Sequence, residues 1–148
     1  MARYQQLQTI FTELITAYGR KDFDTFETHL LPDTHFEWPF LPLPDFPRSM
    51  VGSSAFVAAS KEGMADCTPY GHVVDQFYEM KNPDWLLVEY HTDSVHLPTG
   101  RCYANTYLGI LRFEGDKVAY WKEYVNPLPI LEVYGADFVN QAAKGAGQ

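Results

Sequence analysis

Residues 101–125, RCYANTYLGILRFEGDKVAYWKEYV, contain two long segments with the composition of β-strands, joined by a short turn. Aromatic and β-branched residues are frequent in both segments, 101–113 and 118–125, and the four residues between them, Glu-Gly-Asp-Lys, are typical of a hairpin turn. Two more strand-like segments, 70–80 and 85–97, precede them and are separated by the turn sequence Lys-Asn-Pro-Asp. The second half of the chain is therefore predicted to form a four-strand antiparallel meander.

The first half of the chain is predicted to be mainly helical. Apolar residues recur every three or four positions over 3–18, which is the spacing of an amphipathic helix. Asp22 is the expected N-cap of a second helix that ends at Leu31, and a third helix with a serine cap is expected over 54–64. The alternating segment 35–40 predicts a first strand between them.

This order of elements predicts an α+β fold rather than alternating βαβ units. Strands of ten or more residues twist and curl strongly, so helices on the concave side of the sheet would close a cone with one open mouth. We expect one domain over 1–148, ordered over about 3–140, with three N-terminal helices on a strongly curved antiparallel sheet and a short helix over 127–134. Such a cone is a small-molecule pocket, and its half-exposed convex face predicts a homodimer.

Composition excludes several classes of protein. The net charge of −8 argues against binding to nucleic acid or to an anionic membrane, and no apolar stretch is long enough to span a bilayer. Cys67 and Cys102 form neither a disulfide framework nor a zinc pattern, which indicates reduced thiols and a cytoplasmic location. Aromatic residues make up 16% of the chain, more than a core of this size needs, so some of them are expected to line a cavity.

Four segments in the second half resemble one known family. They are Asn82-Pro83-Asp84-Trp85-Leu86-Leu87-Val88-Glu89, Tyr103-Ala104-Asn105-Thr106-Tyr107-Leu108, Lys122-Glu123-Tyr124-Val125-Asn126-Pro127 and Leu131-Glu132-Val133-Tyr134-Gly135. With the order of elements, they resemble the nuclear transport factor 2-like, or SnoaL-like, superfamily, which includes ketosteroid isomerases, polyketide cyclases and limonene-epoxide hydrolases. The resemblance is closest to the phenazine-biosynthesis A/B proteins, and it implies a cystatin-like α+β cone.

The resemblance implies a chemical role for Glu123. In the phenazine proteins a glutamate on the last strand lies in the pocket as a general acid or base. A carboxyl group among aromatic rings is desolvated, which raises its pKa toward neutrality, and hydroxyls of Tyr103 or Tyr107 are expected to hold it. The alternative is a solvent-facing glutamate paired with Lys122 or Arg112.

Three positions depart from the catalytic sets of this superfamily. The phenazine proteins carry a histidine on the third helix, where this chain has Val57-Ala58-Ala59-Ser60. The ketosteroid isomerases carry an acid before a proline and an aspartate on the penultimate strand, where this chain has Trp38-Pro39 and Gly109. Trp38 is therefore interpreted as either a stacking wall for a planar ligand or a core residue.

The remaining candidates for ligand binding follow from strand alternation and from the resemblance. Tyr103, Asn105 and Tyr107 share the face of Gly109, and Trp121 shares the face of Glu123. If these faces are inward, they supply hydroxyl, amide and aromatic contacts to a ligand.

Two residues outside these strands are further candidates. Tyr18 matches the position of the isomerases' oxyanion-hole tyrosine on the first helix. His35, on the first strand, is either a pocket base or a structural histidine.

A metal site and a bound cofactor are not expected. His91 and Asp93 share one face of a strand while His96 takes the other, so a regular strand cannot offer all three to one ion. The sequence also contains neither a glycine-rich phosphate loop nor a catalytic triad order.

The first hypothesis is a cofactor-independent isomerase, cyclase, dehydratase or condensing enzyme that acts on a small, mostly apolar metabolite. Glu123 would be the acid or base, with His35 assisting. The alternatives are a non-catalytic ligand carrier on the same cone and an interaction module with a vestigial pocket.

Overall fold

The computed structural model describes residues 2–42 and 47–133. Its elements in chain order are α1 (Arg3–Gly19), α2 (Phe23–Thr28), β1 (Leu30–Glu37), β2 (Ser49–Val51), α3 (Ser53–Gly63), β3 (Val73–Glu79), β4 (Trp85–His96), β5 (Arg101–Glu114) and β6 (Lys117–Val125). A further helix covers residues 127–133. The α+β class and the helices at both ends are as predicted, while the end of the expected last helix at Tyr134 and the expected ordered core up to residue 140 lie outside the described residues.

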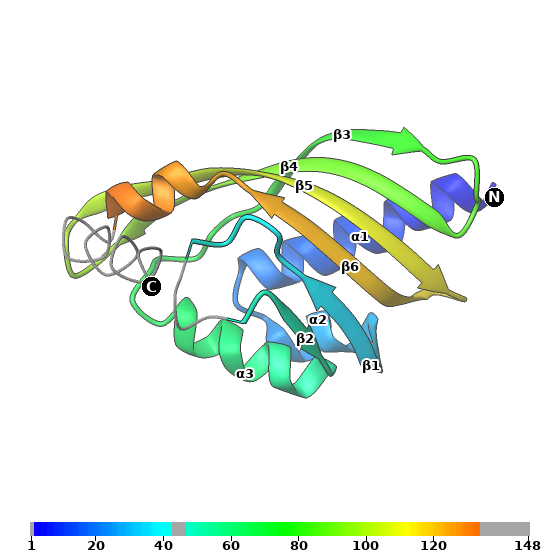
Figure 1. The fold of residues 1–148 in the computed structure, drawn as a ribbon, viewed down its shortest axis with the longest axis horizontal. Coiled ribbons are helices and arrows are strands. Elements are labelled where there is room, and N and C mark those ends of the chain that lie inside the picture. Colours follow the sequence, from blue (N-terminus) through cyan, green and yellow to red (C-terminus); the bar gives the residue numbers. More distant parts are fainter. Residues whose placement is uncertain (1, 43–46, 134–148) are drawn as a thin grey trace, which may run out of the picture.

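The sheet is mixed, with the strand order β2-β1-β6-β5-β4-β3 (Figure 1). The antiparallel meander of β3 to β6 is confirmed. The prediction of a wholly antiparallel sheet is wrong, because β1 pairs with β6 in parallel. Alternation within each strand cannot show this, since direction depends on which strand becomes the neighbour. The three-residue β2, antiparallel to β1, is too short to leave a pattern in the sequence.

The boundaries of the helical half differ from expectation in two places. The second helix ends at Thr28 because Leu30 already pairs with Val118 of β6. The third helix has Gly52 at its N-cap, with φ +112°, instead of a serine. Its first two side chains, Ser53 and Ser54, instead donate to Glu27 Oε1 at 3.2 and 3.1 Å, which ties α3 to α2.

The helices cover the concave face of the sheet (Figure 1). Phe11 of α1 is fully buried, and its ring contacts those of Phe77, Tyr90 and Trp121. Register shifts interrupt the pairing of β1 with β6, of β3 with β4 and of β5 with β6, and bulges at such shifts increase local twist and bend a strand. The curved sheet therefore encloses space between its concave face, α1 and α3.

The structure also bears on two expectations from the sequence, on membrane spans and on the cysteines. No helix in residues 2–42 and 47–133 has both the length and the apolar character needed to cross a membrane. Both cysteines are free thiols, Cys67 buried and Cys102 exposed, as predicted.

Candidate functional site

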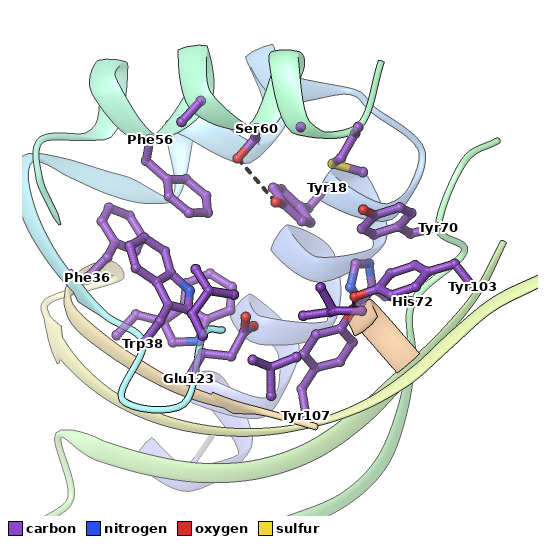
Figure 2. A pocket seen from close by; sticks show the side chains of 17 residues that line it. Tyr18, Phe36, Trp38, Phe56, Ser60, Tyr70, His72, Tyr103, Tyr107 and Glu123 are labelled. Atoms are coloured by element: carbon purple, nitrogen blue, oxygen red, sulfur yellow. Dashed lines mark hydrogen bonds between the residues drawn. The ribbon is translucent and has the colours of Figure 1, made fainter. Parts of the chain in front are cut away.

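A cavity of about 180 Å³ lies between the concave face of the sheet, α1 and α3 (Figure 2). Its walls are mainly aromatic and apolar: Tyr18, Phe36, Trp38, Leu41, Phe56, Ala59, Ser60, Gly63, Met64, Tyr70, His72, Tyr103, Tyr107, Trp121, Glu123, Val125 and Ile130. An apolar cavity of roughly 150 Å³ is large enough to bind benzene. The space therefore fits a molecule of about one or two rings.

Glu123 of β6 is the carboxyl group of this cavity. The Tyr90 hydroxyl donates to Glu123 Oε2, and the Trp38 side chain also donates to this carboxylate. Burial raises the pKa of Glu123 to about 7, although both hydrogen bonds act in the opposite direction. The carboxyl group can therefore both give and take a proton near neutral pH.

The hydrogen-bond partner of Glu123 differs from the expected Tyr103 or Tyr107. Gly109 of β5 lies between Val88 of β4 and Glu123 of β6 in the sheet register. A Cβ built on Gly109 would lie 3.2 Å from Tyr90 Cε1. Because Gly109 has no side chain, the Tyr90 ring can extend across β5 to Glu123.

Trp38 lines the cavity and, at 6% exposed, also belongs to the buried core, so both positions expected for it are occupied by the same ring. The Trp38 and Phe36 rings are nearly parallel at 6.0 Å, and Phe56 of α3 stacks on Phe36 at 4.1 Å. Trp121 also lines the cavity, as its shared face with Glu123 predicted. One end of the cavity is thus a stack of flat aromatic surfaces (Figure 2).

The two tyrosines predicted on β5 lie at the other end of the cavity (Figure 2). The hydroxyls of Tyr103 and Tyr107 are 3.3 Å apart. Asn105 is buried but does not line the cavity: its Nδ2 donates to the Tyr103 hydroxyl at 3.0 Å and to the Asn126 carbonyl at 3.0 Å. Asn105 therefore positions Tyr103, and the prediction that it lines the pocket is wrong.

Tyr18 enters the cavity from α1, as the resemblance implied. Its hydroxyl donates to Ser60 Oγ of α3 at 3.1 Å (Figure 2). Burial raises the pKa of Tyr18, so it stays a neutral phenol. Ser60 belongs to the segment that lacks the family's histidine, and it supplies the polar group of α3 on this wall.

The structure corrects the placement of His35. Phe36 and Trp38 face the cavity, so alternation turns His35 and Glu37 to the outer face of the sheet. There His35 Nε2 lies 3.7 Å from Glu37 Oε1, and the ring packs against Tyr120. His35 cannot act as a base in this cavity.

The histidines of β4 lie on opposite faces of the strand. His96 is buried, whereas His91 is on the opposite face and pairs with Asp75 at 2.8 Å. No group of three His, Cys, Asp or Glu side chains within the described ranges could hold a metal ion.

The sequence analysis did not identify Tyr90, which donates to Glu123 from β4, nor the polar lining residues Ser60, Tyr70 and His72. Alternation from Leu86 and Val88 would have placed Tyr90 on the inner face of β4. His72 lies outside regular structure, just before β3, where the sequence carries no periodic signal. Burial lowers the pKa of His72 to about 3, so its imidazole is neutral at neutral pH.

Comparison with known proteins identifies the family. Residues 11–121 match the SnoaL-like domain family, and the chain belongs to this family. A PhzA/B-like protein of Pseudomonas aeruginosa, itself uncharacterised, is 36% identical over 69 residues, which cover 47% of this chain and 48% of that protein. The chain thus matches about half the length of this curated relative.

Solved structures show the same fold. A proposed isomerase from Bacillus subtilis superposes with a TM-score of 0.82 at 18% identity, covering 91% of this chain and 96% of that one. A Catenulispora acidiphila protein with a ketosteroid isomerase-like fold, in complex with trimethylamine, gives a TM-score of 0.69 at 14% identity, covering 84% and 90%. The fold is also shared with a proposed polyketide cyclase from Xanthomonas campestris and a proposed hydroxylase from Streptomyces galilaeus.

Proposed function

We propose that this protein is a cofactor-independent acid–base enzyme of small-molecule metabolism, of the isomerase, cyclase, dehydratase or condensing type. The observation that carries the proposal is the carboxyl group of Glu123, which has a pKa of about 7 and lies on the wall of an aromatic cavity. General acid–base catalysis is most effective when the pKa of the group lies near the working pH. The aromatic walls favour a flat, mostly apolar substrate.

The elementary step is a proton transfer at a carbon next to a carbonyl group. Ionised Glu123 takes the proton, the C–H electron pair moves into the carbonyl group to give an enolate, and the protonated Glu123 returns the proton to the same or another atom. Tyr90 and Trp38 donate to the carboxylate and fix its orientation. Isomerisation, cyclisation and dehydration can all begin with this step.

Hydrogen exchange tests this step without knowledge of the natural substrate. Two-ring ketones such as 1-tetralone and 2-tetralone are incubated with the protein in D₂O, and loss of the α-hydrogen signals is followed by NMR. We expect exchange above the buffer rate, with a fall of about 10²–10⁴-fold in Glu123→Gln, the usual contribution of a general acid or base.

The matched control is Glu37→Gln. Glu37 also accepts a hydrogen bond from a tyrosine, Tyr120 at 2.7 Å, but on the outer face of the sheet. The Glu37→Gln variant is expected to leave exchange unchanged. No exchange with any ketone of the panel, or equal rates in Glu123→Gln and the wild type, would contradict the proposal.

A second candidate function is non-catalytic binding of a small organic cation. Aromatic faces attract cations, and Glu123 can supply the counter-charge. Among the described residues that line the cavity there is no Lys or Arg. The complex of a structural neighbour with trimethylamine supports this candidate. An amine would bind more tightly as Glu123 ionises above pH 7, whereas a neutral ketone that accepts a hydrogen bond from protonated Glu123 would bind more weakly.

A further inference from the structure

His72 is a polar cavity residue that the proposed acid–base step does not use. It lies between α3 and β3, and its ring contacts those of Tyr18, Tyr70, Tyr90 and Tyr107 at centroid distances of 5.5 to 5.9 Å. Figure 2 shows it beside Tyr103 and Tyr107, on the side of Glu123 away from Trp38. Its surroundings are therefore aromatic, and the Tyr18 ring, which contacts both, lies between it and Phe56 of the stacked rings.

The two ring nitrogens of His72 have different surroundings. Nδ1 is enclosed and has no hydrogen-bond partner among the described residues. It lies against the end of α1, where a Cβ built on Gly19 would come within 3.0 Å of it. Nε2 is therefore the ring nitrogen left to contact a molecule in the cavity that His72 lines.

The surroundings of Nδ1 also indicate which nitrogen carries the proton. The backbone nitrogens of His72 and Gly71 lie 2.7 and 3.2 Å from the same built Cβ position on Gly19. The Gly71 N–H donates to the Gly19 carbonyl at 3.1 Å, which holds this loop against α1. No acceptor among the described residues lies within hydrogen-bond distance of Nδ1, so an Nδ1–H would be a buried donor without a partner, whereas an Nε2–H can donate to a molecule in the cavity. A neutral imidazole then carries its proton on Nε2.

We propose that His72 presents an Nε2–H donor to the cavity and selects ligands that carry a neutral carbonyl oxygen. The proposal rests on the proposed function in that it assigns a recognition residue to the same cavity. The lowered pKa supports it, because an imidazole that stays neutral donates without adding charge. A carboxylate in place of the ketone is disfavoured, because the described cavity lining offers no Lys or Arg to neutralise it. During enolisation the same donor would stabilise the oxygen that gains charge.

The first test measures the tautomer of His72 in the wild-type protein. Nitrogen-15 NMR of labelled histidine distinguishes an unprotonated Nδ1 with a protonated Nε2 from the reverse, and His72→Gln assigns the signals. We expect the Nε2–H form at pH 7. An Nδ1–H form, or a charged ring, would overturn the proposal without reference to any activity.

The second test measures recognition with a matched pair of probes, 1-tetralone and the hydrocarbon tetralin. We expect the ratio of their affinities to fall about 3- to 10-fold in His72→Phe, which keeps a flat ring and removes the donor. His72→Gln, whose amide extends an N–H toward the Nε2 position, should restore much of the ratio. Tetralin affinity itself should change little, which shows that the cavity is intact. An unchanged ratio in His72→Phe would refute the role of His72.

The two proposals fail in different ways. If exchange depends on Glu123 but the preference for the ketone does not change in His72→Phe, the role of His72 is refuted and the acid–base function stands. A ketone preference that depends on His72 without catalysed exchange refutes the acid–base function and leaves a carbonyl-binding protein.

Discussion

Replacement of Glu123 by glutamine should stabilise the protein in a pH-dependent way. The pKa of Glu123 is raised from an ordinary 4.5 to about 7 by burial. Between these two values the unfolded chain has already lost its proton while the folded chain keeps it, so the free energy of unfolding falls as pH rises from 4.5 to 7. Above pH 7 both states are ionised, and the loss is constant. Because glutamine cannot ionise, the free energy of unfolding of the variant does not fall in this way.

The magnitude follows from the shift in pKa. One unit of pKa shift corresponds to about 1.4 kcal/mol, so the full effect is on the order of 3 kcal/mol at pH 8.5 and below about 1 kcal/mol at pH 5. Any constant effect of the amide on packing cancels when the two pH values are compared. The stability difference between Glu123→Gln and wild type should therefore be about 2.5 kcal/mol larger at pH 8.5 than at pH 5.

Urea denaturation of both proteins at pH 5 and pH 8.5 measures this quantity. Carboxyl carbon-13 NMR of Glu123 provides an independent titration of the folded state, with an expected midpoint near 7. A stability difference that is the same at both pH values, or an NMR midpoint near 4.5, would show that Glu123 is solvated. Either result would remove the argument for an acid–base group in the cavity.

Three further predictions concern packing, ligand contact and assembly. Gly19→Ala should destabilise the fold by about 1–3 kcal/mol, because its Cβ would lie 2.7 Å from the backbone nitrogen of His72, whereas Gly63→Ala at the end of α3 meets no atom within 4 Å and should be neutral or stabilising in thermal unfolding. A two-ring ketone should quench tryptophan fluorescence with saturation, and Trp38→Phe should remove most of the quenching; non-saturable quenching would count against stacking. Sedimentation at micromolar concentration should give twice the chain mass of 16.9 kDa, and Ile110→Glu on the outer face should yield monomers; a wild-type monomer would refute the homodimer.

Much of this fold could be predicted from local sequence patterns. The strand-like composition and turn of 101–125 and the helical spacing over 3–18 predicted β5, β6 and α1 within a residue or two, because these elements are long and half-buried. The shared face of Trp121 and Glu123 is also a local property, and the structure places both on the cavity wall. The family resemblance added the role of Glu123, which awaits the experiments above.

Other features depend on which elements become neighbours in space. The parallel pairing of β1 with β6 and the outward position of His35 follow from how the first strand joins the completed meander. Tyr90 reaches Glu123 because Gly109 on the strand between them has no side chain, a relation among three strands. His72 enters the cavity from a loop whose conformation is set by its contact with Gly19, more than fifty residues earlier in the chain. The sequence by itself determined most of the elements and which residues share a face within each, because alternation and helical spacing reflect burial one element at a time. The tertiary structure alone decided which polar groups meet, because their contacts and pKa values depend on packing between segments distant in sequence.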